Sequence, residues 1–194
     1  MLIKNNFEVA QPVEKVWRFF DDIPQVAACL PGTELTDNLG DNKYLGKVAI
    51  GMGPVKLNFA GTAQITERDD QAKRIVVDAA GADEKGRGQA AMSGTASLAP
   101  AAGGTRVEVA LDLQLSGAAA QYGRGMISDV TAILMRDFAT NMQNRMVAVD
   151  RGLSPDQVGS TRAASGFGIA LRAMRLALAR VLRRFFLPYQ PSPS

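Results

Sequence analysis

The fold is decided by residues 105–149, which read TRVEVALDLQLSGAAAQYGRGMISDVTAILMRDFATNMQNRMVAV. Up to residue 115, apolar residues alternate with polar ones, which is typical of a strand with one buried face. From about residue 117 the apolar period becomes that of a helix. The apolar residues on one stripe of this helix are Met126, Ile127, Val130, Leu134 and Phe138. We predict a strand followed by one unusually long helix that runs to about Val149.

The chain before residue 105 predicts one strand, two short helices and a run of further strands. Residues 2–10 alternate, and Pro12 and Pro24 each stand where a helix tolerates proline in its first turn. Strand-like stretches follow over residues 34–37, 43–52, 55–66, 74–80 and 86–98. Because short turns separate consecutive strands, they favour antiparallel pairing. We predict an α+β fold in which a curved antiparallel sheet wraps around the long helix.

The space between sheet and helix is the natural place for a ligand cavity, and the residues allow two interpretations of it. Soft or small residues gather there, namely Met52, Met92, Met126 and Met135 with Gly51, Gly53, Gly61, Gly86, Gly88 and Gly94. They leave room for an apolar ligand. The alternative is a filled core with glycines at strand bends, and periodicity alone favours it.

Composition argues against most catalytic chemistry. The chain has no histidine, which excludes Ser-His-Asp and Cys-His catalysis and removes the commonest transition-metal ligand. The one cysteine, Cys29, has no histidine to activate it. The acidic pairs at residues 21–22, 69–70 and 83–84 stand at predicted turns or helix ends, where solvation explains them. We expect no catalytic residues, no metal site and no enzymatic activity.

Charge divides the chain into an acidic body and a basic tail. Residues 1–161 hold 16 of the 22 basic residues and all 19 acidic ones, a net charge of −3. Residues 162–194 hold the other six basic residues, all arginine, and no acid. A basic tail on an acidic body indicates that the tail meets an anionic surface. We expect no nucleic-acid partner, because the body is acidic and its aromatic residues are not interleaved with basic ones.

Residues 163–187 predict an amphipathic cationic helix. Its apolar stripe holds Phe167, Leu171, Met174, Leu178, Val181, Leu182 and Phe185. Five arginines lie at the margin of that stripe or further round the helix, namely Arg172, Arg175, Arg180, Arg183 and Arg184. Since an arginine near the bilayer centre costs roughly 2.5–3.5 kcal/mol, we expect the helix to lie in the membrane interface and not to span it. The alternatives are a partner's groove or packing on its own domain.

Five short motifs occur in the body: PVEKVW (12–17), CLPG (29–32), GPVK (53–56) with Phe59-x-Gly61, Gly86-x-Gly88, and AAQYGR (119–124). Their order and spacing resemble the G subunit of carbon monoxide dehydrogenase, a family of the START-like (SRPBCC) helix-grip superfamily, over residues 1–148. The resemblance implies a helix-grip fold with a deep hydrophobic pocket. It also implies a role in attaching a molybdenum carbon monoxide dehydrogenase, or a related hydroxylase, to the cytoplasmic face of the cell membrane.

A pocket and a membrane anchor together lead to the hypothesis that the ligand is a respiratory quinone, menaquinone or ubiquinone. Candidate polar contacts to its carbonyls are Gln121, Tyr122 and Arg124. We expect the ligand to contact Phe20, Leu30, Met52, Phe59, Met92, Tyr122, Met126, Ile127, Val130 and Leu134. The expected organisation is a ligand-binding domain over 1–149, a flexible linker over 150–162, the membrane-binding helix over 163–187 and a disordered end over 188–194.

Three classes of function remain open at this point. The first is a carrier of quinone or another lipid that also recruits the dehydrogenase to the membrane. The second is a purely structural recruiter or assembly factor whose pocket is filled by side chains. The third is a START-like cyclase or hydrolase, which kinship of fold allows but the residues do not support.

Overall fold

A computed structural model describes residues 1–53 and 55–153 of the 194-residue chain. The predicted membrane-binding helix over 163–187 and the end over 188–194 lie outside the described residues, as does most of the predicted linker. The described residues belong to one compact unit, Met1–Thr161.

Seven strands and three α-helices make up the described part of this unit. In chain order they are β1 (Leu2–Val9), α1 (Val13–Phe19), α2 (Ile23–Cys29), β2 (Thr33–Gly40), β3 (Lys43–Met52), β4 (Val55–Asp69), β5 (Arg74–Asp83), β6 (Gln89–Ala101), β7 (Gly104–Leu115), the 3₁₀ turn η1 (Gly117–Gln121) and α3 (Arg124–Asp150). All neighbouring strands pair antiparallel in the order β1-β7-β6-β5-β4-β3-β2.

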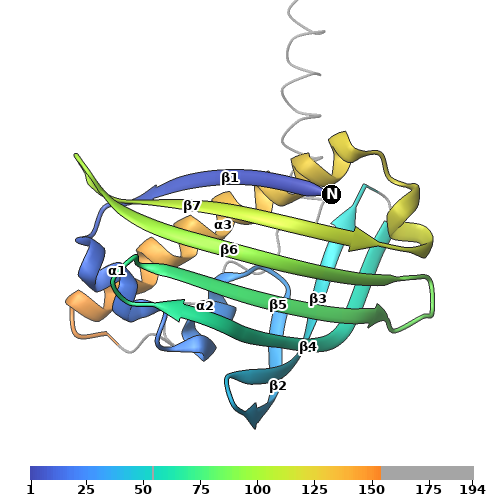
Figure 1. Ribbon diagram of the computed structural model, residues 1–194, viewed down its shortest axis with the longest axis horizontal. Coiled ribbons are helices and arrows are strands. Elements are labelled where there is room, and N and C mark those ends of the chain that lie inside the picture. The colour runs from blue at the N-terminus through green and yellow to red at the C-terminus, as the bar shows by residue number, and fades with distance from the viewer. Residues whose placement is uncertain (54, 154–194) are drawn as a thin grey trace, which may run out of the picture. The chain divides into compact units, whose positions relative to one another are not determined.

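The long helix α3 crosses one face of the sheet, while α1 and α2 lie at one end of it (Figure 1). The predicted curved antiparallel sheet with a long C-terminal helix is therefore confirmed. Several boundaries differ from the prediction: β2, β4 and β5 run three residues further than predicted, and β6 spans Gln89–Ala101 where 86–98 was predicted. The largest difference is at the start of the long helix. Residues 117–121 form the 3₁₀ turn η1, and α3 begins only at Arg124, because the glycines at 117, 123 and 125 are poor helix formers.

Both short helices are fixed in place by local chemistry. Pro24 lies in the first turn of α2, and the side chain of Asp22 accepts a hydrogen bond from the Gln25 amide, which caps that helix. Helix α1 buries Trp17, whose indole Nε1 donates to Asp70 Oδ1 at 2.7 Å. The guanidinium carbon of Arg68 lies 4.2 Å from the centroid of the same indole ring.

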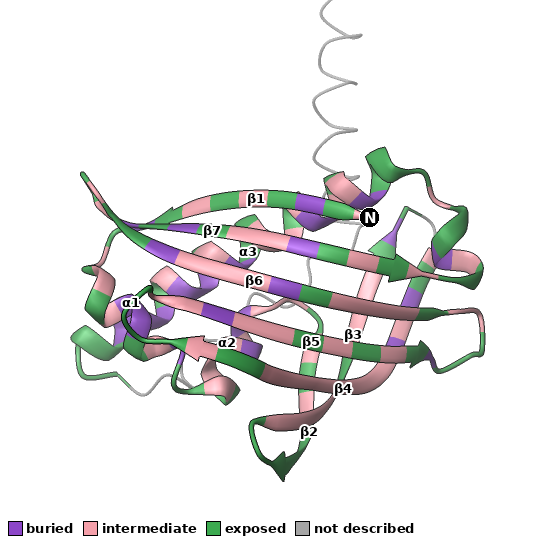
Figure 2. Cartoon of the chain, viewed as in Figure 1, coloured by how far each residue is buried: buried purple, intermediate pink, exposed green. Residues whose placement is uncertain are grey.

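Buried side chains on the inner face of the sheet form two separate clusters, and buried residues recur along the strands between more exposed ones (Figure 2). The cluster beside α1 and α2, here the filled end, comprises Val9, Val16, Trp17, Phe20, Cys29, Ile75, Leu98, Val107, Phe138, Met142 and Met146. The second cluster comprises Ile3, Met52, Leu57, Phe59, Ala119 and Ile127.

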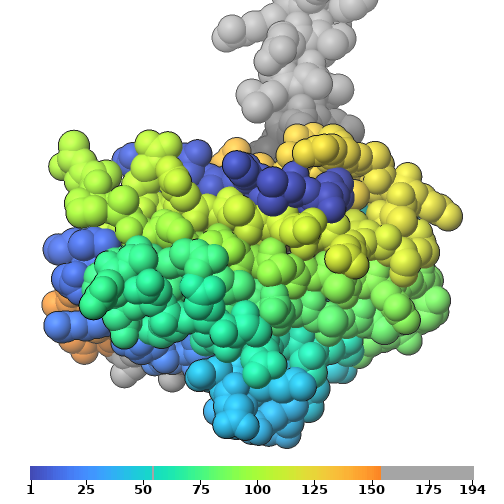
Figure 3. Space-filling model, in the orientation of Figure 1, coloured from blue at the N-terminus to red at the C-terminus, as the bar shows by residue number. Residues whose placement is uncertain are grey.

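Figure 3 shows the molecule from the outer face of the sheet, the face turned away from α3. One row across five strands reads Lys43, Gln64, Asp78, Ser93 and Asp112. This side of the sheet therefore meets solvent, and any apolar binding site of the sheet must lie on the inner face. Among the helices in the described part of the chain, none has the length and apolar character needed to cross a membrane.

Candidate hydrophobic-ligand site

A row of facing glycines interrupts the inner face of the sheet. Gly46 of β3 pairs with Gly61 of β4, which pairs with Gly81 of β5. A Cβ added at Gly61 would lie 2.0 Å from the Ala80 carbonyl oxygen, and one added at Gly81 would lie 2.8 Å from the Ala60 oxygen. The backbones approach so closely here that no side chain fits. The sheet therefore has three consecutive strands without side chains at one level.

The glycine row forms the floor of a hollow of about 190 Å³, here the inner hollow. Apolar side chains make up most of its walls, and they are Leu35, Val48, Phe59, Ala63, Ala79, Ala90, Met92 and Leu113. Their strands are β2 to β7, so the curvature of the whole sheet brings them together. An apolar hollow with few polar groups is the kind of site that binds a hydrophobic small molecule.

Two hydroxyl groups stand at the β2–β3 side of the inner hollow. They belong to Thr33 and Tyr44, which line the hollow from the strands at that side. Neither hydroxyl has a hydrogen-bond partner among the described residues. They are available to a polar group of a bound molecule.

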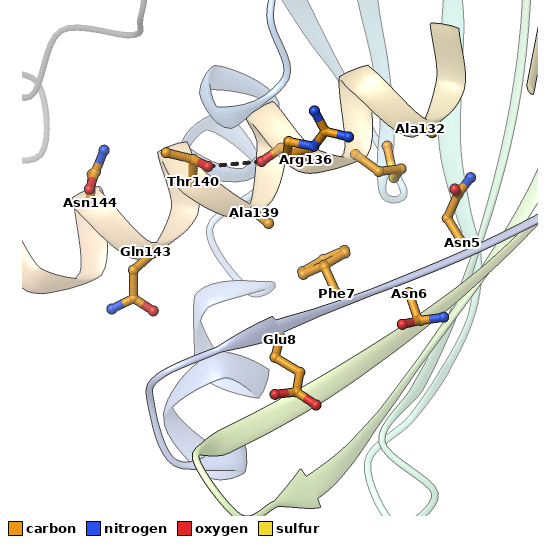
Figure 4. Close-up of a pocket in the computed structure, with 11 residues that line it drawn as sticks. Asn5, Asn6, Phe7, Glu8, Ala132, Arg136, Ala139, Thr140, Gln143 and Asn144 are labelled. Carbon is orange, nitrogen blue, oxygen red and sulfur yellow. Dashed lines mark hydrogen bonds between the residues drawn. The ribbon is translucent and has the colours of Figure 1, made fainter. Parts of the chain in front are cut away.

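A second depression, of about 500 Å³, lies between β1 and α3 and is here called the β1–α3 groove (Figure 4). Phe7 rises from β1 toward the helix and packs edge-on against Phe138, with ring centroids 5.8 Å apart. The groove has apolar walls at Phe7, Ala132, Met135 and Ala139, and polar ones at Asn5, Asn6, Thr140, Gln143 and Asn144, with Glu8 and Arg136 as its charged residues.

The structure distributes the predicted ligand-contacting residues over four environments. Phe59 and Met92 line the inner hollow. Phe20 and Leu30 belong to the filled end or pack against it, and Met52, Tyr122 and Ile127 belong to the second cluster or pack against it. Val130 and Leu134 are half-buried on α3, and Met126 is 43% exposed. Their role in binding stays a prediction, as does that of the membrane-binding residues outside the described range.

The three residues predicted as polar contacts surround the start of α3. Arg124 Nη2 donates to the Leu2 carbonyl oxygen at 2.9 Å, which ties the helix to the edge strand. Tyr122 is half-buried and Gln121 is exposed. None of them lines the inner hollow or the β1–α3 groove.

Two buried titratable groups, Cys29 and Asp83, have shifted pKa values. Burial raises the pKa of the Cys29 thiol from 9.0 to about 11, against a smaller opposing effect of Arg145, so the thiol stays protonated and unreactive. Asp83 is buried, and hydrogen bonds from the Arg87 guanidinium hold the pKa of its carboxyl well below the usual range. Within residues 1–53 and 55–153, no group of acidic, cysteine or histidine side chains is arranged to hold a metal ion.

The sequence matches the family model of the carbon monoxide dehydrogenase G subunit (CoxG) over residues 6–147. The chain belongs to this family. The match to CoxG spans most of the described domain, so membership does not depend on one motif. No curated protein gives a significant match to the chain.

Solved structures share the START-like fold of this CoxG family member. A conserved protein from Geobacillus kaustophilus is 23% identical with a TM-score of 0.67, over 76% of this chain and 95% of that one. A protein from Thermus thermophilus is 17% identical with a TM-score of 0.55, over 77% and 99%. The Zhui aromatase/cyclase from Streptomyces sp. R1128 is 14% identical with a TM-score of 0.55, over 76% and 94%.

Family and fold together support a hydrophobic-ligand binder. Since one neighbour is an aromatase/cyclase, the fold itself serves enzymes as well as binding proteins. Sequence reasoning missed Gly46, Gly81, Ala63 and Ala79 of the inner hollow. These residues could have been found only from the strand register. Gly46 and Gly81 both pair with Gly61, and Ala63 pairs with Ala79 in the next inward-facing row of the sheet.

Proposed function

We propose that this CoxG family member carries a prenylated respiratory quinone, menaquinone or ubiquinone, between the membrane and a molybdenum carbon monoxide dehydrogenase or a related hydroxylase. In this proposal it also recruits that enzyme to the cytoplasmic face of the membrane. The protein acts as a binding protein and performs no chemistry of its own.

The observation that carries the proposal is the inner hollow. Its floor is made of main chain, and its walls are aliphatic, aromatic and thioether groups from six strands. A folded domain ordinarily fills such a space, because every buried methylene adds about 0.8 kcal/mol of stability. The hollow above the glycine row is left unfilled by the side chains around it, which favours a ligand that supplies the missing apolar surface.

Membrane attachment rests on the sequence of residues 163–187. An apolar stripe with arginines beside it suits a helix in the membrane interface, where each basic residue near anionic lipid contributes about 1 kcal/mol. A carrier needs such an anchor, since a prenylated quinone leaves the bilayer only where a protein surface meets it. Recruitment of the dehydrogenase is proposed from the family to which the chain belongs.

The test is mass spectrometry of an organic extract from the full chain, purified without detergent. We expect a prenylated quinone at a ratio approaching one per protein. Another lipid at that ratio would keep a carrier function and change its cargo. An empty extract, together with no binding of added menaquinone-4 or short-chain ubiquinone, would overturn the carrier proposal and leave a recruiter without ligand.

Flotation with liposomes tests the anchor separately. We expect the full chain to float with vesicles that contain anionic phospholipid, and a chain ending at residue 161 to stay in the dense fraction. Equal flotation of the two chains would contradict a membrane role for the tail, whatever the extract contains.

A further inference from the structure

The side chain of Asn5 is a polar group without a partner inside an otherwise satisfied domain. Its amide nitrogen Nδ2 is buried and has no hydrogen-bond acceptor, and among the described residues no other buried side-chain nitrogen or oxygen lacks a partner. Leaving a buried donor unsatisfied costs about 1–3 kcal/mol, and native proteins contain few such groups. An acceptor that binds here would remove that cost.

The position of Asn5 places this donor in the β1–α3 groove. Asn5 lies on the same face of β1 as Ile3, Phe7 and Val9, which is the face toward the interior of the domain. Figure 4 shows Asn5 and Phe7 rising from β1 toward α3. Beside Asn5, the groove offers Phe7, Ala132 and Met135 as apolar surface. A flat apolar ring with a carbonyl on its edge matches such walls and such a donor.

We propose that Asn5 is a ligand-binding residue that donates a hydrogen bond from Nδ2 to a carbonyl oxygen of the carried molecule. This inference rests on the proposed carrier function and adds to it the place of the polar head group. That place differs from the one predicted at residues 121–124, where Arg124 already donates to Leu2.

The distance from Asn5 to the inner hollow sets the shape of the ligand. Asn5 pairs with Val109 of β7, and Leu113, which lines the hollow, lies four residues further along that strand. At about 3.3 Å per residue, this separation is about 13 Å. A ligand that uses both places must therefore be elongated, with a carbonyl-bearing head at Asn5 and a hydrocarbon chain that reaches the hollow.

The experiment compares two ligands that differ only in their carbonyls, menadione and 2-methylnaphthalene, on the full chain. Binding is measured by titration for the wild type, for Asn5→Leu and for Lys4→Leu. The control residue Lys4 precedes Asn5 on the same strand, is exposed, and lines neither the β1–α3 groove nor the inner hollow. We expect Asn5→Leu to weaken menadione binding about three- to tenfold, the range for one hydrogen bond, and to leave 2-methylnaphthalene unchanged. Lys4→Leu should change neither.

Thermal unfolding without ligand separates this role from a structural one. Because Asn5→Leu removes an unsatisfied buried amide, the ligand-free variant should melt at the wild-type temperature or above it. A lower melting temperature would show that the amide has a structural partner and would overturn the inference. Wild-type binding of menadione with an unchanged affinity in Asn5→Leu would also overturn it while the carrier function stands. No binding of menadione or menaquinone-4 by the wild type would overturn both.

Discussion

The two ends of the inner face of the sheet are built from different side chains. At the filled end, Trp17, Phe138 and Met142 interlock with strand residues and are almost fully buried. Around the glycine row, three strands contribute no side chain, and alanines flank the space. The larger packed cluster therefore lies at one end of the sheet, while the inner hollow stays unfilled beside the smaller second cluster.

The largest effect is expected from shortening a side chain at the filled end. Phe138→Ala should lower the free energy of unfolding by about 3–5 kcal/mol, because a large ring leaves a cavity in a packed cluster. Met92→Ala at the inner hollow should lower it by less than about 1 kcal/mol, since its side chain is half-buried beside a hollow. Urea unfolding of both variants measures the contrast, and equal losses would contradict it.

The second prediction concerns the glycine row. Gly61→Ala should destabilise the protein by about 3 kcal/mol, since its Cβ meets the Ala80 backbone, which cannot yield. Gly94→Ala is the control, because its nearest contacts are the side-chain ends of Leu111 at 3.0 Å and Met92 at 3.5 Å. Its change should stay within about 1 kcal/mol. Similar losses in urea unfolding would show that close backbone approach is not what requires Gly61.

A third variant fills the inner hollow without touching the filled end. Ala63→Leu should weaken binding of menaquinone-4 about tenfold, a loss of about 1.4 kcal/mol, because the added side chain occupies ligand space. Ala82→Leu on the outer face should leave the affinity unchanged, since Ala82 is exposed and lies outside the hollow. Titration with the quinone checks both. Full affinity of Ala63→Leu would exclude the inner hollow as the binding place.

The smallest effect is a pH dependence at the filled end. The hydrogen bond from Trp17 lowers the pKa of the Asp70 carboxyl in the folded state. The unfolded carboxyl therefore binds its proton more readily, and the stability that Asp70 adds is present above about pH 4 and lost as pH falls through the folded pKa. Asp70→Asn should be slightly less stable than the wild type at pH 7 and equal to it at about pH 2. Parallel unfolding curves at each pH test this, and a constant difference would contradict it.

Much of the fold followed from local patterns. The alternation over residues 105–115 and the helical stripe after residue 117 predicted β7 and α3, and Pro12 and Pro24 predicted the positions of α1 and α2. These features depend on neighbours in the sequence, so periodicity reveals them. The boundary at Arg124 was missed because a run of small residues carries little periodic signal.

The candidate site was harder to predict, because it depends on pairing between distant strands. Nothing in the sequence distinguishes Gly46, Gly61 and Gly81 from other strand glycines. Only the strand register shows that they lie side by side. Asn5 reads as one polar residue in an alternating strand, and only the fold shows that its amide is buried without a partner. Phe59 and Met92, named from the sequence, do line the inner hollow, since bulky apolar residues on inward strand positions face the interior wherever the sheet curves.

The glycine row also limits how this binding site diversifies in evolution. A floor made of main chain offers no side chain to exchange, and at Gly61 even alanine meets the Ala80 backbone. New ligand preferences must therefore arise in the walls, for example from Leu35 on β2 or Ala90 on β6. Descendants of this protein would keep the same floor and differ in these walls, so the accepted ligands would come to differ in width before they differ in how deeply they sit.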